Sequence, residues 1–337
     1  MKPIQLDGTT GGGQMLRTAL TLAMITGQPF RMTHIRGKRQ KPGLMRQHLT
    51  CVKAACEISD GSVDGAEIGS TEIIFQAGKL RGSSYQFAIG SAGSATLLLQ
   101  TLLPALLHAD GPSKLRLEGG THNPLAPPFE FIDRVFLPAL RRMGAEANVS
   151  LLQSGFAPVG GGIIECEIQP CAKLLPFELH ERGELQSLKL RVPIRNLKAN
   201  IGERMLAAAL AQFPCEDATV EVRDPGPGRG VCCLYEAQFD NTAEISSCIG
   251  ETNVTAERVG HRAAKSLQDF ISSQVPVGRH LADQLLLPMA LAGTGSFTTM
   301  IPDAHVPTNI SIIEKFLPVR FHLTQGERGR VTLILSS

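Results

Sequence analysis

One pattern occurs three times along this chain, and it limits the possible folds more than any other feature. Each copy has an apolar segment of helix length, then a Gly or Pro break, then a segment of strand length. Because strands that alternate with helices pack as layers, the pattern predicts an α/β (α+β) fold made of repeated units. The helical segments cover residues 15–25, 95–107 and 281–291, and the strand segments cover residues 30–35, 114–117 and 296–301.

A stretch between the second and third copies has a different pattern, with enough apolar segments to bury a core of its own. We predict a large repeated-unit domain, residues 1–180 plus 275–337, with a small α/β domain inserted at residues 181–274. In the insertion, the expected strands are residues 188–192, 218–222 and 230–239, and the expected helices are residues 199–213 and 255–273.

Composition and local patterns exclude several classes of protein. The chain has no Trp and only two Tyr, so it lacks the aromatic surface on which nonspecific single-strand binders stack bases. No apolar run reaches the roughly 18 residues that a membrane span needs, and the N-terminus has no signal-peptide pattern. The eight Cys form no CxxC pair and no zinc-type spacing. The simplest interpretation is a cytoplasmic protein with reduced thiols and no membrane association.

A basic segment lies between residues 31 and 53. It holds seven Lys or Arg and no Asp or Glu, although the net charge of the whole chain is only +2. Such a segment is either a solvated loop or a site for phosphates. The guanidinium group is a planar fork that matches phosphate oxygens. The candidate phosphate ligands are therefore Arg36, Arg39 and Arg46, together with Gln47.

Common nucleotide-binding and nucleophile motifs are missing from the sequence. There is no GxxxxGK[ST] loop, no GxGxxG after a strand with an acidic residue downstream, and no GxSxG elbow. If the protein activates phosphate, it does so with another nucleophile.

His305 is the candidate nucleophile. It follows strand 296–301 and precedes an apolar helix expected at residues 310–316, so we expect it in a strand-to-helix loop, where catalytic groups often lie. The start of that helix, capped by Thr308 or Asn309, would stabilise an anion beside the imidazole. Neutral imidazole is a competent nucleophile toward phosphorus near neutral pH.

Polar residues on the apolar helices are further candidates. Asp283 and Gln284 open the third apolar helix, where Asp283 is either a carboxylate favoured by the helix dipole or a catalytic or metal-binding group. Gln100 lies within the second apolar helix, so its amide either makes a core hydrogen bond or faces a ligand.

Several strings along the chain, in order and over nearly its whole length, resemble the RNA 3′-terminal phosphate cyclase family, and its bacterial branch most closely. Residues 181–274 match least specifically. The matching strings cover residues 11–17, 36–48, 89–93, 119–124, 156–162, 281–285 and 305–321.

The resemblance implies three four-stranded, two-helix units plus a small inserted α/β domain. It also implies a ligase-type enzyme that uses ATP and a divalent cation, Mg²⁺ or Mn²⁺. In the implied reaction His305 attacks the α-phosphorus of ATP, and AMP then passes to an RNA 3′-phosphate. The neighbouring 2′-hydroxyl closes a 2′,3′-cyclic phosphate and releases AMP. The implied nucleotide and phosphate sites comprise Gln14, Arg17, Arg36, Arg39, Arg46, Gln47, Gln100, Pro127, His280, Asp283 and Gln284.

Two departures from the family pattern affect these expectations. Thr10 stands where the family has a metal-binding Glu, and the loop before it is about two residues shorter. A hydroxyl cannot supply a carboxylate's charge to a hard divalent ion, so the metal ligand is left unassigned, with Asp7 as an alternative. His280 stands where relatives carry an aromatic residue beside adenine, and imidazole can still stack there.

Two other functions are compatible with parts of the sequence. A noncatalytic cyclase-like RNA-binding or assembly factor agrees with Thr10, but such relatives lack the histidine found at position 305. An enolpyruvyl-transferase-like enzyme agrees with the repeated α/β unit, but not with the order and extent of the matching strings. The sequence therefore favours RNA 3′-phosphate cyclisation.

Overall fold

The computed structural model describes residues 1–336, and the first repeated unit occupies its N-terminal part. Its sheet has the order β1-β2-β4-β3, in which β1 and β2 are parallel and the other pairs are antiparallel. Helix α1 ends at Gly27, whose φ of 68° is the left-handed conformation that favours glycine at a helix end. The elements are β1 (Ile4–Asp7), α1 (Gly12–Thr26), β2 (Phe30–Thr33), α2 (Arg46–Ile58), β3 (Ser62–Asp64) and β4 (Ile73–Gln76).

The second unit repeats this topology. Its sheet has the order β5-β6-β8-β7, again with a parallel first pair followed by antiparallel pairs. The expected burial of the leucine-rich helix α3 is confirmed, because Leu98, Leu99 and Leu102 are buried. The elements are β5 (Ser84–Ala88), α3 (Ala95–Leu106), β6 (Ser113–Gly119), α4 (Phe129–Phe131), the π-helix Ile132–Phe136, α5 (Leu137–Arg142), β7 (Glu146–Gln153) and β8 (Gly162–Gln169).

The third unit is interrupted in sequence. Its first strand, β9, pairs in parallel with β14, although more than a hundred residues separate the two strands. The sheet order is β9-β14-β16-β15, which matches the other two units. The predicted fold class of repeated four-stranded, two-helix units is therefore confirmed. The elements are β9 (Phe177–Leu179), α8 (Arg279–Ala292), β14 (Gly295–Met300), α9 (His305–Phe316), β15 (Arg320–Gln325) and β16 (Arg330–Ser336).

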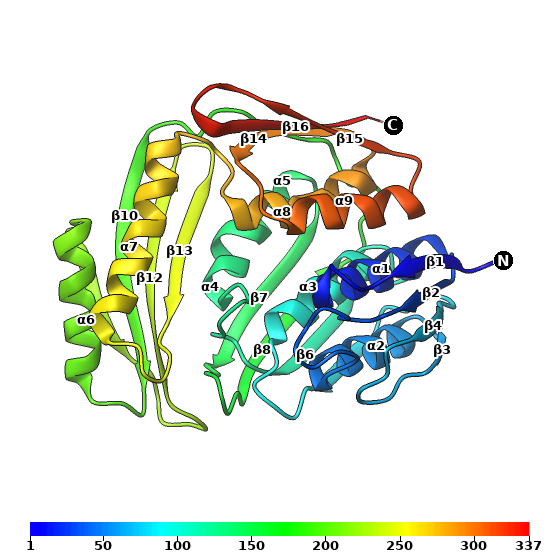
Figure 1. Cartoon of the computed structure of the whole chain (residues 1–337), viewed down its shortest axis with the longest axis horizontal. Coiled ribbons are helices and arrows are strands. Elements are labelled where there is room, and N and C mark those ends of the chain that lie inside the picture. The colour runs from blue at the N-terminus through cyan, green and yellow to red at the C-terminus, as the bar shows by residue number, and fades with distance from the viewer. Residues whose placement is uncertain (337) are drawn as a thin grey trace.

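A fourth sheet, in the order β11-β10-β12-β13, lies between β9 and α8 in the chain. Figure 1 shows this sheet and its helices α6 and α7 at one end of the molecule. Its buried side chains form a separate hydrophobic cluster, which includes Leu190, Tyr235 and Leu267. The division into two domains at residues 181 and 274 stays a prediction. The elements are β10 (Leu185–Arg195), α6 (Ala199–Gln212), β11 (Asp217–Val222), β12 (Gly230–Phe239), β13 (Ala243–Ile249) and α7 (Ala256–Ser273).

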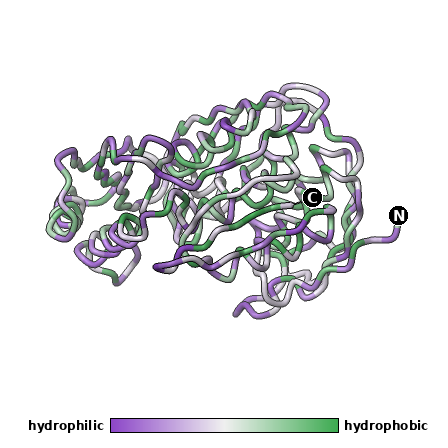
Figure 2. Tube along the Cα trace, turned by 90° about the horizontal axis from the view of Figure 1, so that it is seen from above, coloured by the Kyte–Doolittle hydropathy of each residue, from purple (hydrophilic) through white to green (hydrophobic). Residues whose placement is uncertain are grey.

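The three units enclose a shared layer of helices. Helix α1 packs against α2, α3 and α9, and α9 packs in turn against α8. One continuous hydrophobic cluster runs through all three units. Figure 2 shows apolar segments in the interior and polar segments at the periphery. No helix within residues 1–336 is both long and apolar enough to span a membrane.

Strand β13, which the sequence did not predict, brings a buried carboxyl group to the junction with α8. Glu244 is only 5% exposed, and its Oε2 atom has no hydrogen-bond partner among the described residues. The carboxyl group lies against Gly278 at the start of α8, where a Cβ would collide with it. Burial raises the pKa of Glu244 to about 8.

Glu244 should therefore lower the free energy of unfolding as the pH rises. Below its ordinary pKa the carboxyl group is protonated in both the folded and the unfolded state, so its ionisation does not affect that free energy. Between that value and about 8, only the unfolded state releases the proton, so unfolding becomes easier with rising pH. Denaturant unfolding should show that Glu244→Gln gains on the order of 4 kcal/mol over wild type at pH 8. The gain should vanish at pH 4. An equal gain at both pH values would contradict this account.

Candidate active site

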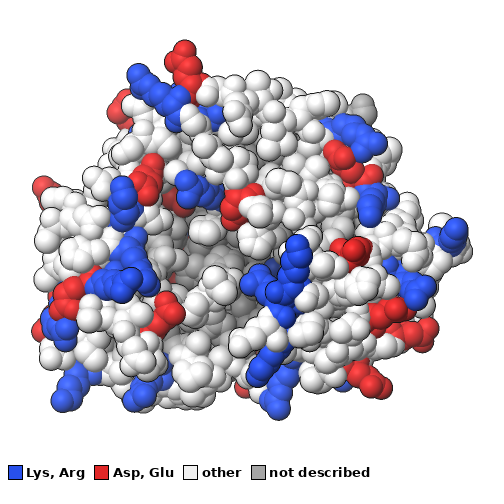
Figure 3. All heavy atoms as spheres, viewed as in Figure 1, with Lys and Arg blue, Asp and Glu red and all other residues white. Residues whose placement is uncertain are grey.

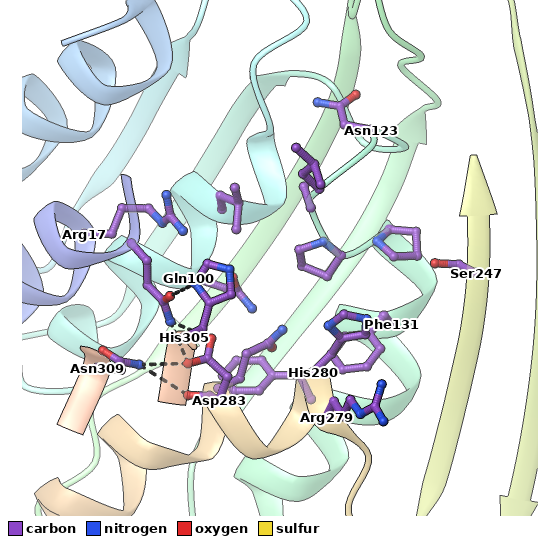
Figure 4. A pocket seen from close by; sticks show the side chains of 18 of the residues that line it. Arg17, Gln100, Asn123, Phe131, Ser247, Arg279, His280, Asp283, His305 and Asn309 are labelled. Atoms are coloured by element: carbon purple, nitrogen blue, oxygen red, sulfur yellow. Dashed lines mark hydrogen bonds between the residues drawn. The ribbon is translucent and has the colours of Figure 1, made fainter. Parts of the chain in front are cut away.

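A cavity of about 530 Å³ lies where α1, α3, α8 and α9 meet the loop before α4. Figure 4 shows its side chains converging from these helices, which are distant in sequence. The structure thus brings together most of the residues predicted from the sequence. The predicted residues that line it are Gln14, Arg17, Gln100, Pro127, His280, Asp283, Gln284 and His305.

His305 is the first residue of α9 and does not lie in a loop, so that part of the sequence prediction was wrong. The helix begins five residues earlier than expected because Pro307 is tolerated in a first turn, where its missing N–H needs no partner. The expected caps were also wrong. The carboxylate of Asp303 accepts the backbone N–H of His305 at 2.8 Å, whereas Thr308 donates its hydroxyl to the carbonyl of Ala304.

Gln14, at the start of α1, determines which nitrogen of His305 carries the proton. Its amide nitrogen donates to both carboxylate oxygens of Asp283 at 2.6 Å, so its amide oxygen points the other way. That oxygen lies 2.5 Å from Nδ1 of His305. Because an amide oxygen can only accept, Nδ1 must be the protonated nitrogen. Nε2 then keeps its lone pair and is free to act as a nucleophile.

Asp283 is held from a second side by α9. The amide nitrogen of Asn309 approaches its Oδ1 atom at 3.3 Å, and the hydroxyl of Thr18 donates to the amide oxygen of Asn309 at 2.6 Å. Burial raises the pKa of Asp283 above its ordinary value. Helix α8 begins at Arg279, so Asp283 lies beyond its first turn. The interpretation of Asp283 as a carboxylate placed for the helix dipole is therefore wrong, and its partners are side chains of the cavity.

Two of the predicted residues in the cavity have amide groups with unused hydrogen-bonding atoms. Nε2 of Gln100 and Oε1 of Gln284 are buried without a partner among the described residues. Buried polar atoms without partners are costly, so these atoms point to a ligand that supplies the missing acceptor and donor. For Gln100 this favours the ligand-facing alternative over a core hydrogen bond. Pro127 and His280 line the same cavity and offer flat apolar surfaces to a planar base.

The remaining predicted residues, Arg36, Arg39, Arg46 and Gln47, do not line this cavity. Arg36 donates to the carbonyl of Gly43, and Arg46 to that of Gly90 before α3. Arg39 approaches Gly12, whose φ of 58° needs glycine. Gln47 accepts the backbone N–H of Ser94, the residue that caps α3, at 2.8 Å.

The four predicted arginines are not neutralised by ion pairs within the described part of the chain. Among residues 1–336, neither Arg17, Arg36, Arg39 nor Arg46 has a carboxylate within 4.0 Å. Figure 3 shows Lys and Arg side chains along one rim of the hollow on this face. Unpaired guanidinium groups around a cavity are suited to bind phosphate oxygens.

Sequence reasoning missed three kinds of residue at this site. His48 packs against Gly13, and burial, with help from Arg17, lowers its pKa to about 3, so it stays neutral. Asn123 lines the cavity and has a buried amide oxygen without a partner. Strand β13 contributes a wall that includes Ser247 and Cys248. Both His48 and Asn123 lie within sequence strings that resemble the family. Their place in those strings could have identified them as candidates.

The side chains present do not fit a preformed metal site. Thr10 is exposed, and within residues 1–336 no three His, Cys, Asp or Glu side chains are grouped as metal ligands. Asp7, the alternative ligand, is not part of such a group: its Oδ1 atom accepts the backbone N–H of Thr9 at 3.0 Å and lies 3.3 Å from Nδ1 of His34. We therefore derive no chemical step through a metal ion.

An oriented imidazole and the unpaired guanidinium group of Arg17 thus line one cavity. The model of the family described as RNA 3′-terminal phosphate cyclase matches residues 9–323 of the chain. The chain therefore belongs to the RNA 3′-terminal phosphate cyclase family, as its sequence strings predicted.

Two solved structures show weaker similarity. The enolpyruvyl transferase NikO from Streptomyces tendae shares 10% identity at a TM-score of 0.40, over 98% of this chain and 47% of that one. The EPSP synthase from Acinetobacter baumannii shares 13% identity at a TM-score of 0.34, over 98% of this chain and 64% of that one. The chain spans about half and just under two thirds of these proteins, and similarity at this level carries no argument about function.

Proposed function

We propose that this protein uses ATP to convert an RNA 3′-phosphate end into a 2′,3′-cyclic phosphate, with His305 as the residue that carries AMP. The observation that supports this most directly is the hydrogen-bonded series from Asp283 through Gln14 to His305. It leaves the Nε2 lone pair of an exposed imidazole beside a cavity large enough for a nucleotide.

The first step is transfer of AMP to the protein. Nε2 of His305 attacks the α-phosphorus of ATP, a P–N bond forms, and pyrophosphate leaves. Nearby, Arg17 and Arg39 offer positive charge to the phosphate oxygens that gain charge in the transition state. The imidazolium that forms keeps its Nδ1–H on Gln14, so no proton has to move when the bond is made.

The second and third steps act on the RNA. An oxygen of the 3′-phosphate attacks the α-phosphorus, the P–N bond breaks, and His305 is restored. The 2′-hydroxyl oxygen then attacks the 3′-phosphorus, AMP leaves, and the hydroxyl proton passes to solvent. Because the 2′-hydroxyl is adjacent to the activated phosphate, closure is intramolecular and needs little assistance from the protein.

Nucleotide binding is proposed on the same grounds. Pro127 and His280 would flank the adenine, and the unpartnered amide atoms of Gln100 and Gln284 would hydrogen bond to the nucleotide. The divalent cation that the resemblance implies stays a prediction.

Labelling with ATP that carries radioactive α-phosphate tests the proposal. The wild-type protein should acquire acid-labile, base-stable label, as a phosphorus–nitrogen bond predicts. Addition of an RNA with a 3′-phosphate should discharge the label as free AMP and produce a cyclic end. If wild-type protein takes up no label with Mg²⁺ or Mn²⁺, the noncatalytic RNA-binding function, which Thr10 favours, replaces this proposal.

Thr10→Glu should strengthen metal binding, because it restores a carboxylate where the family has one. Titration with Mn²⁺ in the presence of ATP, followed by electron paramagnetic resonance, should give roughly tenfold tighter binding than in wild type. Thr10→Gln has nearly the same shape without the charge and should behave as wild type. Equal Mn²⁺ affinity in all three proteins would show that residue 10 lies outside the metal site.

A further inference from the structure

A groove of about 460 Å³ lies between helix α2 and strand β5, outside the cavity that holds His305. On one side the groove is lined by a face of α2 that carries Arg46, Leu49, Thr50 and Lys53. Residues 86–89 line the opposite side. We call it the α2–β5 groove. Strand β5 is an edge strand of its sheet, so one side of its backbone has no strand partner within the described sheet.

The cations of this groove have no ion-pair partners among the described residues. Of the seven Lys and Arg between residues 31 and 53, only Arg31 has a carboxylate within 4.0 Å, that of Glu72, among the described residues. Arg46 donates one N–H to the carbonyl of Gly90 at 2.8 Å, which leaves its other N–H groups available. Arg46 and Lys53 are two helical turns apart, about 10 Å along α2. Two unpaired cations at this spacing suit a charged polymer better than a single small anion.

The first turn of α2 lies between the groove and the proposed active site. Three successive residues in the first turn of α2 make different contacts. Arg46 lines the groove, Gln47 accepts the backbone N–H of Ser94, and His48 packs against Gly13. Gly13 also approaches Arg17, which lines the cavity of His305. An RNA chain that ends at His305 would therefore pass over the first turn of α2 to enter the groove.

We propose that the α2–β5 groove binds the RNA strand on the 5′ side of the reacting 3′-phosphate; this rests on the proposed function. Arg46 and Lys53 would hold successive phosphodiesters, and Leu49 with Ile68, which is 60% exposed, would offer an apolar surface to a base. Glu57 lines the end of the groove that is farther from Arg46, and its negative charge would repel any phosphodiester beyond the one at Lys53. Contacts of this kind read charge and shape and not base identity.

Reversing one charge tests the proposal without touching the nucleotide site. Lys53→Glu should bind an octanucleotide with a 3′-phosphate about tenfold more weakly than wild type, with a shallower salt dependence. Binding is measured by fluorescence anisotropy without ATP. A dinucleotide with a 3′-phosphate does not reach Lys53 and should bind both proteins equally. Unchanged octanucleotide affinity and salt dependence would overturn the proposal.

Lys198→Glu is the matched control, because Lys198 is exposed, unpaired among the described residues, and precedes α6 at the other end of the molecule (Figure 1). It should bind the octanucleotide as wild type does. An oligoglutamate peptide of equal charge should displace the octanucleotide poorly, because it lacks bases for the apolar surface. Equal displacement would overturn the assignment of the groove to RNA.

The same variants separate this proposal from the proposed function. Lys53→Glu should still acquire label from ATP at the wild-type rate, because adenylylation of His305 needs no RNA. Normal labelling with unchanged RNA affinity rejects the groove alone. Absent labelling in wild type together with weaker RNA binding by Lys53→Glu rejects the enzymatic function and keeps the groove.

Discussion

Replacement of His305 by alanine should abolish labelling of the protein by ATP and, with it, formation of the cyclic RNA end. The loss should exceed about a thousandfold. No other described side chain in the cavity has a nitrogen lone pair free for attack while its second ring N–H is hydrogen-bonded to an acceptor. His305 is exposed, so the variant should fold and unfold as wild type does. Acid-labile label per mole of protein, resolved by gel electrophoresis, is the measurement.

His280→Ala is the control for this change, because His280 lines the same cavity from α8. It should raise the ATP concentration needed for half-maximal labelling and leave the labelled fraction at saturating ATP unchanged. Robust labelling of His305→Ala would remove His305 as the nucleophile. Loss of label in both variants would instead indicate a general role in nucleotide binding.

Gln14→Leu should slow labelling by about a hundredfold, although Gln14 does not touch the reacting phosphorus in the proposed mechanism. Leucine is similar in size but cannot accept the Nδ1–H of His305, so the imidazole loses both its preferred tautomer and its orientation. Gln14 is thus a positioning residue. The rate of label formation at saturating ATP is the measurement, since ATP affinity should change little.

A second variant separates positioning from a general structural role. Asp283→Asn replaces one of the two carboxylate oxygens that accept the amide N–H of Gln14 with an NH2 group, and it keeps the other acceptor. It should therefore show a smaller loss of labelling rate, about tenfold, with ATP affinity near the wild-type value. Weaker ATP binding in both variants, in parallel with the slower labelling, would indicate that the site is merely distorted.

Most of the longer helices were predictable because their signals are local. The periodic apolar segments and the Gly or Pro breaks located α1, α3 and α8 to within a few residues. Among the described strands, only β2, β6, β10, β11, β12 and β14 were predicted individually. Two of the missed strands, β9 and β13, illustrate different physical reasons. Strand β9 has only three residues and is stabilised by pairing with β14, far along the chain. Strand β13 carries the buried polar residues Glu244 and Ser246, which break the apolar pattern of a covered strand.

The candidate site was predictable as a set of residues but not as an arrangement of atoms. Sequence strings identified Gln14, Asp283 and His305, yet these side chains come from α1, α8 and α9. Gln14 and His305 are 291 positions apart, so no local pattern records that one orients the other. The contribution of β13 to the cavity wall could not be predicted either. It depends on the packing of the fourth sheet against α4 and the π-helix of the second unit.

The sequence by itself determined the repeated unit, the family and the seven cations between residues 31 and 53, since each depends on residue types in order along the chain. Tertiary structure alone decided which of those cations are unpaired and which nitrogen of His305 is free. Arg31 is neutralised by Glu72 from outside the segment, whereas Lys53 is not. The reason is physical: an ion pair or a hydrogen bond depends on distance in space, and folding brings together groups that the sequence keeps apart.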